Sequence, residues 1–171
     1  LHRMISEALP QIVVPDYPLR SEIDAASAVL RKNKMQIGVD DGYFLGYGWY
    51  PAEKSEMDPT IKFRWTMEEA HVFLTGTPEG GILNLEVYAI PELIGLPVRG
   101  RIKIGDLTLT EFELLKDGWQ TVSCMMPRGL TGPVDISIIT DTIWRPSKVF
   151  ANNDPRRLGV GVKSISWEEA R

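Results

Sequence analysis

Cysteine and histidine are both scarce in this chain. Its 171 residues contain one cysteine, Cys124, and two histidines, His2 and His71. A single thiol cannot form an intrachain disulfide, so no oxidising compartment is indicated and we expect a cytoplasmic location. Cys124 lies in an apolar run, where a small buried hydrophobe is expected, and two histidines leave little acid–base chemistry at neutral pH.

Excess positive charge and long apolar runs are also lacking. The formal net charge is -4 and the pI is about 5.3, whereas binding to nucleic acid requires a basic surface. No apolar run approaches the roughly 20 residues that cross a bilayer, and no secretory signal pattern opens the chain. We therefore expect neither nucleic-acid binding nor membrane insertion. Because the first residue is Leu1 and not Met, we expect a segment of a longer protein or a processed product.

Signatures of catalysis, cofactors and metals are missing too. The sequence has no phosphate-binding glycine loop, no HExxH motif and no Cys/His pair at zinc spacing. It therefore predicts a non-enzymatic chain with no catalytic residue, no cofactor and no metal ligand. Only 40–41 and 152–154, which carry acidic loop side chains, merit inspection as a structural calcium site.

Hydrophobic residues alternate with polar ones over most of the chain. The alternating stretches are 61–65, 83–89, 98–104, 134–138 and 158–162. This period of two is typical of half-buried strands, and turn residues separate the stretches, as in the expected hairpin at Ile104–Leu107. We predict an all-β protein, a two-sheet antiparallel sandwich with a jelly-roll-like topology.

The first part of the chain has a different pattern. Three prolines interrupt residues 10–18, and an alanine-rich run with a capping signature predicts a helix over 22–34. We therefore divide the chain into an N-terminal linker or helical extension at 1–42 and a β-sandwich domain at 43–171.

Aromatic and charged residues cluster in the first part of the predicted sandwich. Trp49, Tyr50 and Glu53 are followed by Arg64 and Trp65. Such groups suit a sugar, whose apolar face stacks on rings and whose hydroxyls bond to charged planar groups. Trp65 is in phase with Phe63, so we expect it in the core, with Arg64 on the opposite face and within reach of an ion pair from Glu53.

Two further features have both structural and functional interpretations. Trp144 and Arg156 flank a turn at 152–154, where Asp154 and Arg156 form either a structural ion pair or part of a ligand site. Arg99, Arg101 and Lys103 share one strand face, which we interpret as a solvated face or a protected edge in preference to a site for an anionic partner.

A family resemblance rests on four short motifs in a fixed order. They are Gly48-Trp49-Tyr50 with Glu53, then Arg64-Trp65, then Pro146 to Phe150, and then Asp154 to Val162. Over residues 43–168 the chain resembles the β-sandwich accessory domains of bacterial glycosyltransferases and surface-polysaccharide assembly proteins. It departs from that pattern at Gly161, where a small branched or alanine-like residue is usual.

The resemblance implies a jelly-roll module that binds carbohydrate beside a glycan-building enzyme. The ligand-binding residues that we predict are Trp49, Tyr50, Glu53, Arg64, Trp144 and Arg156, and the expected partner is a glycan or a glycan-processing enzyme domain. The alternative is a structural or interaction module that packs against a catalytic domain or forms a homo-oligomer. A lyase or hydrolase on a jelly roll is a weaker alternative, because histidine is scarce.

Overall fold

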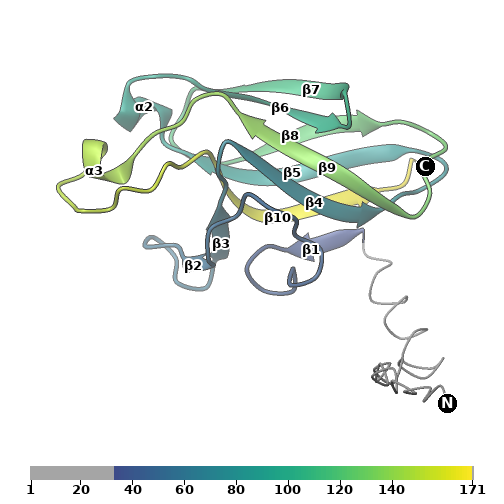
Figure 1. The fold of residues 1–171 in the computed structure, drawn as a ribbon, viewed down its shortest axis with the longest axis horizontal. Helices are drawn as coiled ribbons and strands as arrows, with labels where there is room; N and C mark the ends of the chain where they lie inside the picture. The colour runs from purple at the N-terminus through teal and green to yellow at the C-terminus, as the bar shows by residue number, and fades with distance from the viewer. Residues whose placement is uncertain (1–32, 171) are drawn as a thin grey trace, which may run out of the picture.

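The computed structural model describes residues 33–170, which form two packed antiparallel sheets (Figure 1). One sheet has six strands, with the order β2-β3-β10-β5-β8 and β1 paired to β10, and the other has the order β4-β9-β6-β7. The first sheet comprises β1 (Lys34–Gln36), β2 (Glu53–Lys54), β3 (Lys62–Trp65), β5 (Gly81–Ala89), β8 (Gly118–Met126) and β10 (Gly161–Glu168). The second comprises β4 (Glu69–Thr75), β6 (Val98–Ile104), β7 (Leu107–Leu114) and β9 (Pro133–Thr140). The all-β, jelly-roll-like sandwich that the sequence predicts is confirmed.

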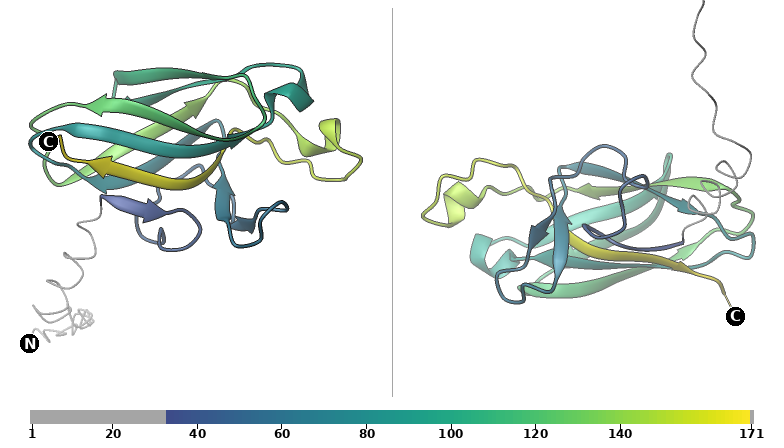
Figure 2. Two further views of the ribbon diagram at one scale, coloured as in Figure 1. Left: turned by 180° about the vertical axis from the view of Figure 1, so that it is seen from behind. Right: turned by 90° about the horizontal axis from the view of Figure 1, so that it is seen from below.

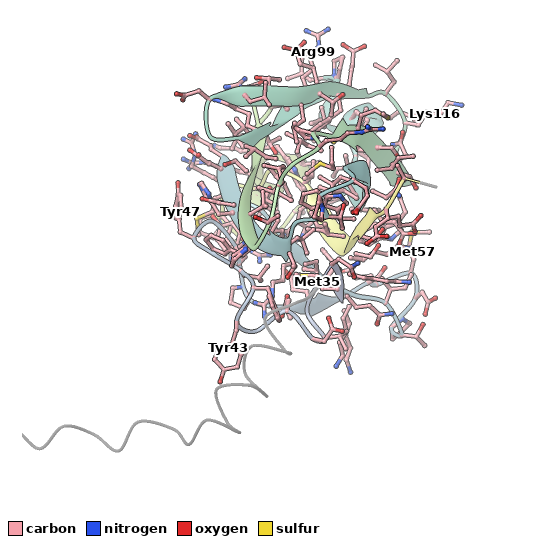
Figure 3. All side chains as sticks on the ribbon, turned by 90° about the vertical axis from the view of Figure 1, so that its right-hand side faces the viewer. Met35, Tyr43, Tyr47, Met57, Arg99 and Lys116 are labelled. Atoms are coloured by element: carbon pink, nitrogen blue, oxygen red, sulfur yellow. The ribbon has the colours of Figure 1, made fainter. Side chains whose placement is uncertain are left out.

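The alternating residues of the strands form the main core between the two sheets. Leu83, Leu85 and Val87 of β5 are fully buried, as are Ile136 and Ile138 of β9. Since side chains in a strand alternate between the two faces, the residues between them lie on the outer surfaces. Figure 3 shows Arg99 at the periphery of the molecule, where it projects from its strand.

The six-stranded sheet begins before the domain boundary that the sequence predicts at residue 43. Strand β1 pairs with β10, and Met35 and Ile37 are both buried in the main core. Lys34, expected as the last residue of the helix over 22–34, is therefore in a strand. Residues 22–32 of that helix and the extension before it lie outside the described residues.

The stripe of cations lies on β6, which is an interior strand of its sheet and therefore not a protected edge. Arg99 pairs with Glu113 at 2.5 Å, and Arg101 pairs with Asp141 at 2.9 Å. The hairpin expected at Ile104–Leu107 is confirmed, since these residues face each other in the pairing of β6 with β7. Gly105 supplies the left-handed conformation of the turn, with φ of 54°.

Two one-turn helices and the β2–β3 segment gather at one end of the sandwich. The helices are α2 (Pro91–Ile94) and α3 (Pro146–Val149), and each begins with a proline, which suits a first helical position. The two further views in Figure 2 show the same grouping. The outermost part of that end is the α3 loop, which is the connection 141–160 between β9 and β10. Among the described residues, no helix combines the length and apolar character needed to cross a membrane.

Candidate functional site

A row of aromatic residues crosses the outer face of the six-stranded sheet. Trp65 of β3 lies opposite Gly161 of β10, Gly161 lies opposite Tyr88 of β5, and Tyr88 lies opposite Trp119 of β8. Directly paired residues in antiparallel strands share a face. Because the neighbouring Val87 points into the main core, this row points away from it.

The rings of this row form a second hydrophobic cluster, separate from the main core. Phe63 meets Trp65 and Trp119 edge to face, with ring centroids 5.5 and 5.6 Å apart. Trp65 meets Trp144 in the same manner at 5.5 Å, so the segment before α3 covers the row. Edge-to-face contact is a preferred geometry for aromatic pairs, because the positive ring edge faces the negative ring face.

Gly161 makes room for this cluster. A Cβ atom on Gly161 would lie 3.1 and 3.2 Å from two ring carbons of Phe63 and 3.2 Å from the Cβ of Tyr88. Those distances are shorter than ordinary carbon–carbon contacts. Gly161, where the chain departs from the resembled pattern, is therefore the residue over which the Phe63 ring lies.

A pocket of about 280 Å³ opens beside the aromatic cluster, between the β2–β3 segment and the α3 loop. Tyr88 and Trp119 are half-buried on its floor, and Phe150 is 44% exposed. Its polar lining residues include Glu53, Lys54, Ser55, Glu56, Asn152, Asp154 and Arg156. The pocket therefore combines aromatic surface with hydrogen-bonding groups.

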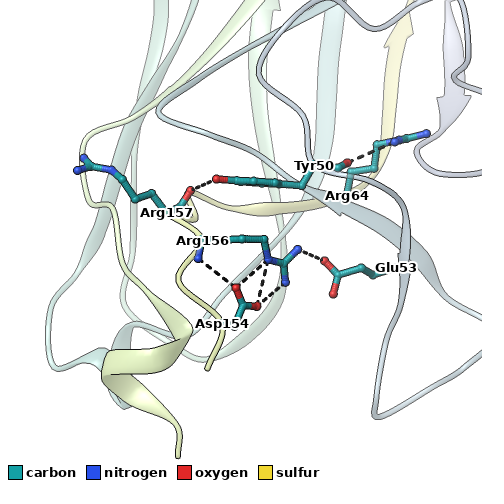
Figure 4. Close-up of polar contacts among 6 residues, drawn as sticks. All are labelled: Tyr50, Glu53, Arg64, Asp154, Arg156 and Arg157. Carbon is teal, nitrogen blue, oxygen red and sulfur yellow. Dashed lines mark hydrogen bonds and ion pairs between the residues drawn. The ribbon is translucent and has the colours of Figure 1, made fainter. Parts of the chain in front are cut away.

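Arg156 holds the two sides of the pocket together, as the close-up in Figure 4 shows. Its guanidinium donates from Nη2 to Asp154 Oδ2 at 2.7 Å and from Nη1 to Glu53 Oε2 at 2.7 Å. The ring of Tyr50 lies 5.4 Å from the guanidinium carbon, and the Tyr50 hydroxyl donates to the Arg157 carbonyl. Glu53 and Arg156 are 103 residues apart in sequence, so this brace joins distant parts of the chain.

The brace also sets the ionisation of its members. Hydrogen bonds from the Arg156 guanidinium hold the pKa of Asp154 below its ordinary value. Hydrogen bonds to Asp154 and to Glu53 raise the pKa of Arg156 further above its already high value. Both shifts keep Asp154 and Arg156 charged at neutral pH.

The structure brings together three of the six residues that the sequence predicts as ligand-binding. Glu53, Trp144 and Arg156 line the pocket. Tyr50 contacts the Arg156 guanidinium with its ring and does not line the pocket. Trp49 is remote, since its Nε1 donates to the His71 carbonyl at 2.8 Å and its ring packs against the main core. Ligand binding by any of them stays a prediction.

Arg64 takes a partner other than the one expected. Its Nε donates to Asp41 Oδ2 at 2.8 Å, and the side chains of the two residues are 24% and 4% exposed. Glu53 does not pair with Arg64, because Arg64 lies on the opposite face of β3 from Phe63 and Trp65, whereas Glu53 lies beside the pocket. The positive charge of Arg64 therefore balances the negative charge of the buried Asp41 carboxylate.

The two acidic clusters considered for calcium have protein partners instead. Asp41 accepts hydrogen bonds from Arg64 and from the Gly38 amide, and Asp40 accepts one from the Gln36 amide. At the second cluster, Asp154 is engaged by Arg156. Within residues 33–170, no group of three or more histidine, cysteine or acidic side chains is placed to hold a metal ion.

Sequence reasoning missed the partly exposed rings that line the pocket: Tyr88, Trp119 and Phe150. A signal was present for Trp119, because it is out of phase with Val122 and Cys124, whose side chains point into the core. That pattern places Trp119 on the outer face, but the rings it meets there depend on the strand order.

Comparisons with known proteins find similar structures but no related sequence. No family model matches the chain, and no curated protein matches it. Three of the similar structures are carbohydrate-binding modules. A family 6 module from Clostridium cellulolyticum in complex with xylose has a TM-score of 0.47 at 8% identity, over 81% of this chain and 98% of the module.

The C-terminal family 6 module of LamC, a marine laminarinase from Zobellia galactanivorans, has a TM-score of 0.45 at 13% identity, over 78% of this chain and 99% of the module. The CBM36-1 domain of a multidomain xylanase from the hindgut metagenome of Trinervitermes trinervoides has a TM-score of 0.45 at 12% identity, over 81% of this chain and 100% of that domain. Likenesses this distant do not assign the chain to a family.

Proposed function

We propose that this domain is a non-catalytic carbohydrate-binding module and that the glycan binds in the pocket beside α3. The observation that carries the proposal is the composition of this pocket. Trp119, Tyr88 and Phe150 offer partly exposed rings, and Glu53 and Asn152 offer polar groups next to them. Rings stack on the apolar face of a sugar, while carboxylates and amides bond to its hydroxyls.

The expected affinity is modest. One ring stack and a few hydrogen bonds, less the cost of ordering ligand and side chains, correspond to a Kd of roughly millimolar to micromolar. Such binding suits a module that raises the local concentration of a glycan near an enzyme.

Ring removal tests the proposal directly. A glycan-array screen of the isolated chain, with acidic bacterial polysaccharides included, identifies a ligand for titration by calorimetry or NMR. We expect Trp119→Ala and Phe150→Ala to weaken binding by tenfold or more, since each removes a stacking surface. Tyr43→Ala is the matched control, because Tyr43 is 88% exposed and does not line the pocket. Unchanged binding in both pocket variants, with their folds intact, would contradict the proposed site.

A second candidate function, a protein-interaction module, has one observation in its favour. Met57, Leu93 and Phe150 line the same pocket and are exposed, Met57 by 88%. Exposed apolar side chains around a hollow also suit a partner that inserts an apolar anchor. If Met57→Ser and Leu93→Ser abolish self-association measured by light scattering, and no glycan binds, this candidate is the better one.

We further propose that the module works beside a bacterial glycosyltransferase or polysaccharide-assembly protein in the cytoplasm. The support for this is the order of the sequence motifs, from Gly48-Trp49-Tyr50 to Asp154–Val162. Sequencing the gene around the segment tests it: a glycan-building catalytic domain in the same or an adjacent reading frame is the expected result. A secreted glycan-degrading enzyme in that position would overturn it.

A further inference from the structure

Arg156 is the guanidinium of the pocket, and protein carboxylates already engage a donor on each of its nitrogens. Nε donates to both oxygens of Asp154 at 3.0 Å, Nη2 donates to Asp154 Oδ2, and Nη1 donates to Glu53 Oε2. A guanidinium has five N–H donors, so one on Nη1 and one on Nη2 remain beyond these bonds. A ligand carboxylate that binds there shares the guanidinium charge with Asp154 and Glu53. The charge of Arg156 is therefore already balanced by carboxylates of the protein.

The ionic groups that line the pocket, those of the brace included, carry one more negative than positive charge. The carboxylates of Glu53, Glu56 and Asp154 outnumber the two cations, Lys54 and Arg156. An excess of negative charge repels an anionic ligand, and the repulsion is strongest at low ionic strength.

One carboxylate oxygen remains available to a ligand. Arg156 takes Glu53 Oε2, and in the part of the chain that the structure describes no side chain or amide donates to Glu53 Oε1. An ionised carboxylate only accepts hydrogen bonds. This oxygen can therefore accept a hydrogen bond from a sugar hydroxyl, whereas it repels a carboxylate on the ligand.

The pocket is also small. Its volume of about 280 Å³ lies just below the range of about 300–1,000 Å³ typical of sites for drug-sized ligands. The β2–β3 segment and the α3 loop bound it on two sides, with the aromatic cluster as its floor. A ligand of one or two sugar rings fills such a volume, and further rings extend into solvent.

From the charge, the free acceptor and the size, we infer that the pocket selects an uncharged terminal sugar unit of one or two rings. In this arrangement Glu53 is the residue that discriminates against acidic sugars. The inference rests on the proposed carbohydrate-binding function and specifies the ligand class of the same pocket.

Paired neutral and acidic sugars test the inference. The probes are glucose, galactose and mannose with their uronic acids, together with neutral oligosaccharides of increasing length, titrated by NMR at low and high salt. We expect each bound neutral sugar to bind about tenfold more tightly than its uronate at low salt, with a smaller ratio at high salt. Affinity should stop rising with chain length beyond the disaccharide.

Two isosteric variants separate the role of Glu53 from a general charge effect. Glu53→Gln keeps an acceptor oxygen and removes the charge, so the ratio of uronate affinity to neutral-sugar affinity should rise several-fold, whatever the change in absolute affinity. Glu111→Gln makes the same change of charge on an exposed residue of β7 and should leave that ratio unchanged. Thermal unfolding of each variant verifies that its fold is intact.

The outcomes distinguish the inference from the proposed function. If no saccharide binds, the proposed function fails and the inference fails with it. If uronates bind as tightly as neutral sugars, or if affinity keeps rising with chain length, the inference is overturned while the carbohydrate-binding function stands.

Discussion

Substitution of Gly161 by alanine tests how tightly the aromatic cluster packs on the sheet. The added methyl would meet the Phe63 ring at 3.1 Å and the Cβ of Tyr88 at 3.2 Å. Neither neighbour can easily retreat, because the Phe63 ring is buried between Trp65 and Trp119 and the Tyr88 Cβ is fixed to strand β5. Overpacking of this kind costs about 1–3 kcal/mol.

A smaller effect opposes that cost. Alanine restricts the unfolded chain more than glycine does, which stabilises a protein by about 0.4–1 kcal/mol where the backbone accepts alanine. The φ angle of Gly161 lies outside the left-handed range, so this gain applies. The net expectation is a loss of about 1 kcal/mol, which lowers Tm by roughly 2–4 °C in a chain of this size.

The matched control is Gly42→Ala. Gly42 also has an ordinary φ angle, and a Cβ there meets nothing within 4 Å, so only the gain from the unfolded chain remains. Urea unfolding followed by tryptophan fluorescence measures both variants. If Gly161→Ala is as stable as Gly42→Ala, the close packing of Phe63 over residue 161 is wrong.

Three other predictions concern buried and paired groups. Arg64→Met should cost about 3–5 kcal/mol in urea unfolding, because it leaves the buried Asp41 carboxylate uncompensated, and the double variant with Asp41→Asn should recover part of that loss. The pKa of Asp154 in the folded chain lies below its ordinary value of 3.8. The stability that ionised Asp154 contributes is therefore complete above pH 3.8 and is lost as pH falls through the folded pKa. The difference in free energy of unfolding between the parent chain and Asp154→Asn, measured from about pH 7 to about pH 2, should accordingly disappear in acid. Burial raises the pKa of Cys124 to about 11, so a thiol reagent at pH 8 should react slowly with the folded chain and quickly in urea, and equal rates would contradict the burial.

The sequence pattern predicts which residues share a face more reliably than what covers that face. Trp65 was expected in the core from its phase with Phe63, and both residues are buried. They lie, however, in the second cluster on the outer face of the six-stranded sheet. Period-two alternation holds equally for either face of a strand, and only the long segment that includes Trp144 determines that this face is covered.

Short elements and long-range partners are the parts that the sequence could not predict. Strand β1 has three residues, and a single buried Met35 between two polar neighbours is too little for a periodic signal. The pairing of Glu53 with Arg156 depends on strands β2 and β3 reaching the α3 loop. Arg64 was the expected partner of Glu53, because its phase relative to Phe63 and Trp65 places it on the face away from the core, within reach of an ion pair.

The charged residues that line the pocket also hold its two sides together, and this determines which variants can report on binding. Glu53, Asp154 and Arg156 hold the two sides of the pocket together, so removing any of these charges weakens the fold as well as the site. Loss of binding in an Arg156 variant therefore cannot distinguish a ligand contact from a structural brace. Phe150 lines the same pocket, is 44% exposed and carries no charge. Its truncation removes ring surface from the pocket without unpairing a carboxylate, which makes Phe150→Ala the more decisive variant for assigning the ligand to this pocket.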